Sequence, residues 1–204
     1  MATKQQKKEA TFVVDKAGLA KLMERRGKEF VVGELIQNAL DEQVTNVAMT
    51  LEQLPDGLAE ITVEDDNPEG FKDLGHAYTL FAESAKKSDP GKRGRFNLGE
   101  KLVIALCREA TISTTKGTVV FTADGRQMLP STRDCGSRFT GVLPMNADEF
   151  ARACEFVETL IIPAGVKVTF NGAPLPDRPV LNVFQASLRT ERANWTGARA
   201  CSRQ

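Results

Sequence analysis

Several features that mark common protein classes are missing from this sequence. Its four cysteines are widely spaced and form no Cys-x-x-Cys pair, which argues against a zinc site or a disulfide scaffold. The chain has no apolar run of about 18 residues and no hydrophobic signal core near its start, so we expect a cytoplasmic protein that does not contact membranes. An intact glycine-rich loop ending in Lys-Ser or Lys-Thr is also missing, which disfavours a P-loop NTPase.

Charge of one sign is not in excess either. Lys plus Arg and Asp plus Glu both total 27, so net charge gives no support for a nucleic-acid partner, although local basic clusters leave one open. Hydrophobic residues make up 41% of the chain and charged residues 26%, which are ordinary globular values and argue against gross disorder. At 204 residues the chain is long enough for one domain with a substantial core.

The most informative segment is the octet Glu34-Leu-Ile-Gln-Asn38-Ala-Leu-Asp41. It lies in a stretch, 29–42, where apolar residues recur at the three-to-four spacing of an amphipathic helix. On that helix Glu34, Asn38 and Asp41 fall at i, i+4 and i+7, so their side chains project from one stripe. Such a row is unfavourable to bury without partners. It is typical either of a solvated helix face or of a site for a hydrated metal and a nucleotide.

A second motif follows the alternating, β-branched run 58–64, which predicts a half-buried strand. The chain continues as Glu64-Asp65-Asp66-Asn67-Pro68-Glu69-Gly70, and its acidic residues beside Asn-Pro and Gly indicate a tight turn at the strand end. Ligand contacts are common at such strand ends, and a carboxylate there can accept a hydrogen bond from an exocyclic amine. The alternative is a plain acidic surface turn.

A third motif is the glycine-containing basic segment that precedes an apolar helical run at 102–107. Glycines ahead of a helix N-terminus let backbone N–H groups approach a phosphate, and basic side chains complement its charge. The surrounding polar stretch, 83–99, is predicted to be a mobile lid over a nucleotide, or else an ordinary surface loop. The residues expected to shape this phosphate-facing loop are Lys92, Arg93, Gly94, Arg95, Phe96, Leu98, Gly99 and Lys101.

In this order the three motifs resemble those of the GHKL (Bergerat-fold) ATPases, which include topoisomerase ATPase subunits, heat-shock chaperones, MutL-type and MORC proteins and histidine kinases. Glu-x-x-x-Asn-Ala-x-Asp is similar to their first motif, 66–71 to the Asp-x-Gly-x-Gly motif, and 94–99 to the chaperone lid loop. A fourth candidate, Gly136-Ser137, resembles their Gly-Thr motif. The resemblance covers about residues 28–172, and the pattern is closest to the MutL, MORC and chaperone branches. Departures are Pro68 and Asn97 in place of glycines, and Ser137 in place of Thr.

The resemblance implies a role for each matching residue. Glu34 would be the general base that activates water, and Asn38 would ligate the Mg²⁺ that bridges the phosphates of ATP. Asp66 would receive the adenine amino group, with Asp65 as the alternative one residue away, and Gly70 would leave room for the ring. Asp41 would support the first motif or the adenine-side water network, while Ser137 would contact the phosphate side.

The resemblance also favours hydrolysis over kinase activity. Histidine kinases need no water-activating base, their first motif usually has Lys in place of Asp41, and the only histidine, His76, is expected to be structural or at the surface. We expect an ATPase whose lid controls a protein partner or a separate transducer subunit, with a nucleotide-dependent homodimer and DNA-related work as further expectations. The alternatives are a non-hydrolysing nucleotide-gated module and a scaffold that binds no nucleotide.

The expected fold is α+β, a two-layer sandwich of the Bergerat type with a mixed, mostly antiparallel sheet and helices on one face. We expect residues 1–11 to be a flexible arm, 12–180 to be the ATP-binding domain, and 181–204 to be a basic tail that is disordered or docks on a partner. Predicted helices span 15–27, 29–42, 71–82, 98–109 and 147–161; predicted strands span 46–52, 58–64, 110–115, 118–123, 137–143 and 166–170.

Overall fold

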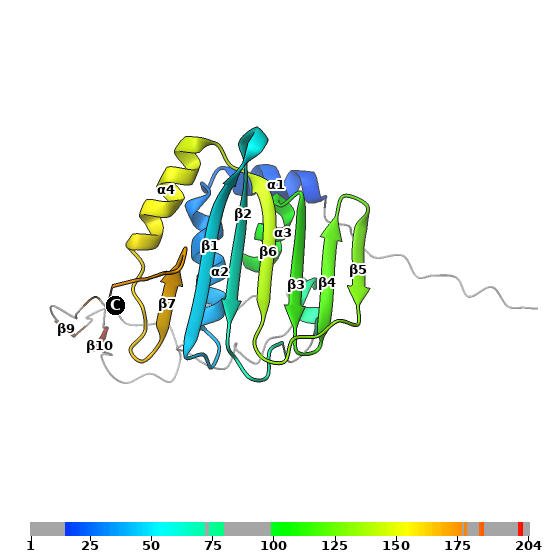
Figure 1. Cartoon of the computed structure of the whole chain (residues 1–204). Helices are drawn as coiled ribbons and strands as arrows, with labels where there is room; N and C mark the ends of the chain where they lie inside the picture. Colours follow the sequence, from blue (N-terminus) through cyan, green and yellow to red (C-terminus); the bar gives the residue numbers. More distant parts are fainter. Residues whose placement is uncertain are drawn as a thin grey trace, which may run out of the picture.

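The computed structural model contains a mixed sheet of eight strands, seen face-on in Figure 1. It describes residues 15–71, 74–79, 99–176 and 178, together with two short strands farther along the chain. The sheet consists of β1 (Asn46–Leu54), β2 (Leu58–Asp65), β3 (Glu109–Thr114), β4 (Gly117–Thr122), β5 (Gly125–Leu129), β6 (Arg138–Pro144), β7 (Lys167–Phe170) and β8 (Ala173–Pro174). Their order across the sheet is β5-β4-β3-β6-β2-β1-β7-β8, and β9 (Phe184–Gln185) pairs separately with β10 (Ala200–Cys201). Among the eight strands only β1 and β7 pair in parallel.

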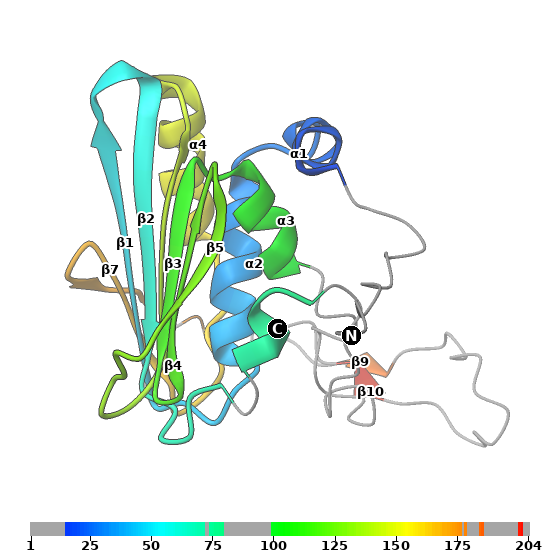
Figure 2. The ribbon, with the colours of Figure 1, turned by 90° about the vertical axis from the view of Figure 1, so that its right-hand side faces the viewer.

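The α-helices form a second layer on one face of this sheet, as Figure 2 shows, and its other face has no helix in the described part of the chain. They are α1 (Lys16–Glu24), α2 (Glu29–Leu40), α3 (Gly99–Leu106) and α4 (Ala147–Glu158), with short 3-10 helices η1 (Pro55–Gly57) and η2 (Leu74–Ala77). The prediction of an α+β sandwich with a mostly antiparallel sheet is therefore confirmed.

The core lies between the two layers and follows from simple alternation. In β2, Ala59, Ile61 and Val63 are buried toward the helices, while the intervening side chains lie on the bare face. In α2 the apolar stripe of the sequence, from Val31 to Ala39, is buried against the sheet. Gly33 lies within that stripe, and a Cβ there would come within 3.3 Å of Phe156 Cζ in α4. Gly33 therefore permits close packing of α2 against α4.

The position of β6 decides where the site forms. Although it follows β3 to β5 in the chain, β6 lies between β2 and β3, antiparallel to both. Its first residue, Arg138, is opposite Glu64 near the end of β2. The second motif and Gly136-Ser137 are therefore brought together at one end of the sheet.

The N-terminus of α4 carries a reciprocal capping box. The Asn146 side chain accepts a hydrogen bond from the Glu149 backbone N–H at 2.9 Å, and Glu149 Oε2 accepts one from the Asn146 N–H at 2.8 Å. We expect Asn146→Ala to lower the free energy of unfolding by about 1 kcal/mol, measured by urea denaturation. Asp148→Ala, at an exposed position of the same turn, is the control. An equal loss in the two variants would contradict the capping role.

The sequence predictions do not include η1 or the two-residue strands β8, β9 and β10, and two longer segments also differ from the structure. The helix predicted over 71–82 is wrong for its described part, which contains only the 3-10 helix η2; Gly75 lies within this turn and disfavours a longer helix. The sequence also missed β5, because Gly125–Leu129 contains none of the β-branched residues that mark strands.

Candidate functional site

Glu34 and Asn38 of the first motif lie in α2, and Asp41 is the C-cap residue of that helix. Glu34, Asn38 and Asp41 are each half-buried, whereas the residues that face the sheet are fully buried. Burial raises the pKa of Glu34 above its usual range, and the positive charge of Arg26 opposes this shift without cancelling it. The Arg26 guanidinium itself lies 3.8 Å from the centroid of the Phe30 ring. The helix thus presents a carboxylate of increased basicity and an amide on one accessible stripe.

Asp66 holds the start of β1. Its Oδ1 accepts hydrogen bonds from the backbone N–H groups of Thr45 (2.8 Å) and Asn46 (3.0 Å), and Oδ2 accepts one from Thr45 Oγ1 at 2.5 Å. Slight burial acts to raise the pKa of Asp66, but these hydrogen bonds outweigh it and the pKa is lowered. Both carboxylate oxygens of Asp66 therefore have structural partners within the protein.

Asp65 has a different environment. It shares the strand parity of Ile61 and Val63, whose side chains face the helix layer. Its Oδ1 accepts hydrogen bonds from Asn67 N (2.9 Å) and Ser137 N (3.2 Å), while Oδ2 accepts none from the described residues. Burial is the main cause that raises the pKa of Asp65; the two N–H groups oppose the shift, and the negative charges of Glu42 and Asp66 add to it. Asp65 therefore has one oxygen fixed by the backbone and one available as an acceptor.

Gly136 lets the chain before β6 cross the end of β2 at contact distance. It has φ +72°, and a Cβ there would lie 1.8 Å from the carbonyl oxygen of Asp65. Its N–H donates to Asn67 O at 3.1 Å, and Asp65 N donates to Ser137 O at 2.9 Å. The Gly136-Ser137 motif therefore holds the turn that carries Asp65.

Gly70 is needed for packing against the turn between β3 and β4. It has φ +58°, and an added Cβ would lie 2.7 Å from Thr115 Oγ1. That hydroxyl donates to Glu69 O at 2.7 Å, which fastens the second motif to the turn. Pro68, in the same turn, is exposed to solvent.

Most of the third motif lies outside the described residues. This applies to Lys92, Arg93, Gly94, Arg95, Phe96 and Leu98, to 83–98 of the predicted lid, to the arm 1–11 and to the tail except for β9 and β10. Gly99 is the first residue of α3, and the Lys101 side chain in the first turn is buried.

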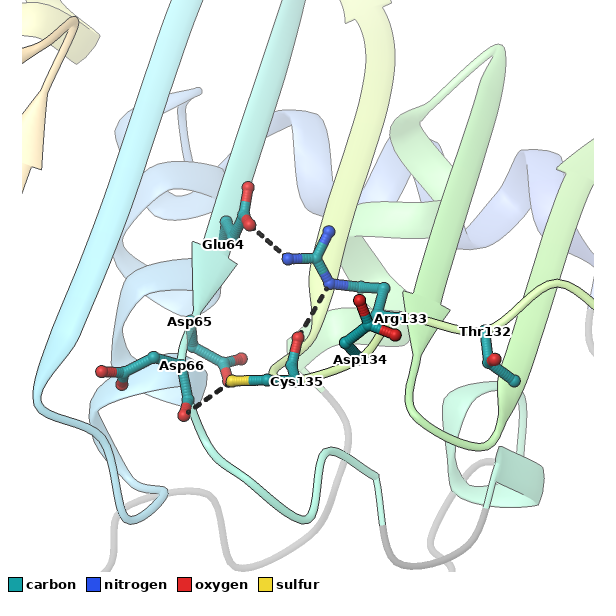
Figure 3. Close-up of a pocket in the computed structure, with 7 residues that line it drawn as sticks. All are labelled: Glu64, Asp65, Asp66, Thr132, Arg133, Asp134 and Cys135. Atoms are coloured by element: carbon teal, nitrogen blue, oxygen red, sulfur yellow. Dashed lines mark hydrogen bonds and ion pairs between the residues drawn. The ribbon is translucent and has the colours of Figure 1, made fainter.

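A cavity of about 460 Å³ lies at the end of β2. Figure 3 shows its lining residues, which are Glu64, Asp65, Asp66, Thr132, Arg133, Asp134 and Cys135. Glu34 and Asn38 do not line it, so the cavity is a separate feature from the α2 stripe. The sequence singled out Asp66 and left Asp65 as the alternative; the alternation of Ile61, Val63 and Asp65 is the signal that favours Asp65.

Comparison with known proteins does not assign the chain. It matches no protein-family model and no curated protein. Within the described ranges, no helix is long and apolar enough to cross a membrane, and no cluster of three or more His, Cys, Asp or Glu side chains is arranged to hold a metal.

Proposed function

We propose that this protein binds ATP with Mg²⁺ in a Bergerat-type site and hydrolyses it to ADP and phosphate. The observation that supports the proposal is the hydrogen bonding of the Asp65 carboxylate. Its carboxylate is held at the end of a central strand by Ser137 N–H and Asn67 N–H, with Oδ2 left as an acceptor within the described structure. A partly buried acceptor beside the helix that carries Glu34 and Asn38 suits an adenine amine at one end of a nucleotide and phosphates at the other.

Each residue then has a defined task. Asp65, in preference to Asp66, accepts the hydrogen bond of the adenine amino group, because both oxygens of Asp66 already bond to Thr45 and Asn46. Asn38 fits Mg²⁺, which prefers oxygen ligands and usually keeps several waters, so one half-exposed amide with phosphate oxygens is sufficient. Bound Mg²⁺ would neutralise phosphate charge. Glu34 takes a proton from the attacking water, a task that its raised pKa favours.

A non-hydrolysing, nucleotide-gated module is the second candidate. It is favoured by Pro68 and Asn97, which stand where the resembling motifs have glycines. In either case a protein partner, a transducer subunit or a second copy of the chain would sense whether nucleotide is bound.

The proposal is tested by titrating the purified protein with ATP, with and without Mg²⁺, while following binding by calorimetry and phosphate release. We expect Mg²⁺-dependent binding with slow release of phosphate. Binding without release would select the gated module. Absence of binding at millimolar ATP would overturn both and leave the scaffold reading.

Substitution of the two neighbouring aspartates separates their roles. We expect Asp65→Asn to weaken ATP binding by about 100-fold, because loss of a charged hydrogen bond and an unfavourable amide–amine contact amount to roughly 2–3 kcal/mol. Asp66→Asn should change ATP affinity less than threefold and instead lower the melting temperature. Isothermal titration calorimetry and thermal unfolding measure the two effects. If Asp66→Asn loses the affinity and Asp65→Asn retains it, the sequence-based assignment to Asp66 is right.

A further inference from the structure

Two arginines on either side of Gly136-Ser137 converge on one carboxylate. Glu64 Oε2 accepts hydrogen bonds from Arg138 Nε at 2.8 Å and Nη2 at 2.5 Å, and Glu64 Oε1 accepts one from Arg133 Nη2. Figure 3 shows Arg133 reaching from the loop to Glu64 at the end of β2. Glu64 and Arg138 are register partners with side chains on the bare face of the sheet. This network therefore lies on the opposite face from Asp65, which faces the helix layer.

The same loop has further anchors. The Arg133 N–H donates to Thr114 O at the end of β3 (2.9 Å), and Arg133 Nε donates to Cys135 O (3.2 Å). The Cys135 thiol donates to Asp66 O at 3.4 Å. The path of residues 133–138 is therefore fixed on both sides of Ser137, whose N–H orients Asp65.

The ion pair between Arg133 and Glu64 is partly shielded from solvent. The Arg133 and Glu64 side chains are only 21% and 31% exposed, so solvent screens this pair less than an ordinary surface pair. Partial burial acts to raise the pKa of Glu64, but the hydrogen bonds and charges of Arg138 and Arg133 lower it overall. The carboxylate is thus ionised across the neutral range, and its geometry is of the strong, charge-assisted kind.

We propose that Glu64, with Arg133 and Arg138, is a positioning residue that sets the purine selectivity of the nucleotide site. This inference rests on the proposed function, because it takes Asp65 as the base-reading group. By fixing Ser137 N–H on Oδ1, the network turns Asp65 Oδ2 toward the base. An adenine amine can donate to that oxygen, whereas the carbonyl of guanine in the same place would repel it. A site built around one such hydrogen bond discriminates strongly against the wrong partner.

The test uses Glu64→Gln and Arg133→Gln in the full chain. Affinities for ATP, GTP and inorganic tripolyphosphate are measured by calorimetry, and hydrogen exchange follows the Gly136 and Ser137 amides. We expect each variant to weaken ATP about tenfold, a typical effect of a supporting residue, with GTP and tripolyphosphate changed less than twofold. Exchange at Ser137 should accelerate, and the double variant should lose no more than either single one.

Arg152→Gln is the matched control. It breaks a comparable ion pair, to Glu29 Oε1 at 3.0 Å, which ties α4 to α2 away from the Asp65 turn. The control should leave the ATP-to-GTP ratio and the Ser137 exchange unchanged.

The possible failures are distinct. An unmodified protein that binds no ATP removes the proposed function and this inference with it. If the unmodified protein binds ATP but Glu64→Gln and Arg133→Gln keep its ATP-to-GTP ratio, only the inference falls. Equal weakening of all three ligands, or global unfolding in both variants, would give Glu64 a purely structural role and also overturn it.

Discussion

Glu34→Gln is expected to reduce phosphate release by at least about 100-fold, the contribution typical of a general base, while ATP affinity changes little. Gln preserves the length and shape of the side chain but cannot accept the proton of the attacking water. The measurement pairs calorimetric ATP affinity with single-turnover phosphate release. Glu60→Gln, a half-buried glutamate on the bare sheet face, is the matched control and should retain both properties.

Because the pKa of Glu34 is raised, the unmodified protein and this variant should also differ in how activity and stability depend on pH. In the proposed mechanism hydrolysis requires the ionised Glu34 carboxylate. The rate in the unmodified protein should therefore fall as pH decreases through the raised pKa, and the acid limb should lie above 4.5, the ordinary value. For folding the sign is opposite, because burial penalises the charged form and stability is lost as pH rises through that pKa. Glu34→Gln should therefore melt higher than the unmodified protein at pH 7, with a smaller gain near pH 4. Full turnover in the variant would remove Glu34 from the mechanism.

Gly136→Ala is expected to lower the free energy of unfolding by at least about 4 kcal/mol, an exceptional loss for one methyl group. The backbone has φ +72°, and the new Cβ would lie 1.8 Å from the carbonyl oxygen of Asp65. No side-chain rotation relieves this overlap, because the obstructing atom belongs to the backbone of a central strand. The crossing of β2 and the loop would have to open.

Gly172→Ala isolates the conformational part of that effect. Gly172 has φ +80°, but nothing lies within 4 Å of its added Cβ, so only the left-handed backbone is penalised, by about 1–2 kcal/mol. Urea denaturation followed by circular dichroism compares the two variants. Equal losses would mean that the loop yields to the methyl group and that the Gly136 contact is not a constraint.

The elements with strong periodicity could be predicted from the sequence. The segment 29–42 predicts α2 because its apolar residues recur every three to four positions, and 58–64 predicts β2 because β-branched residues alternate. β5 could not, since its position depends on pairing with β4 and not on its own composition. The placement of β6 between β2 and β3 could not be predicted from local sequence patterns either, because it depends on pairing between strands far apart in the chain.

The location of the candidate site could be predicted from the sequence, but the choice between its two neighbouring aspartates could not. The sequence identifies an acidic turn after β2, yet the choice between Asp65 and Asp66 depends on which one the Ser137 N–H contacts and which one caps Thr45. Those contacts join residues far apart in the chain. The supporting role of Glu64 has the same origin, because neither arginine is near it in sequence.

The late arrival of β6 also constrains how the protein folds. Glu64 and Arg138 are 74 residues apart, and Asp65 and Ser137 are 72 apart, so the hairpins β1–β2 and β3–β4 can form before either contact exists. Closing such long loops is slow, and non-local pairing usually limits the folding rate. Strand insertion would then be the step that completes both the sheet and the Asp65 turn. A nucleotide that binds this turn would bind only fully folded molecules. The rate at which nucleotide binding appears during refolding would therefore measure the rate of that final step.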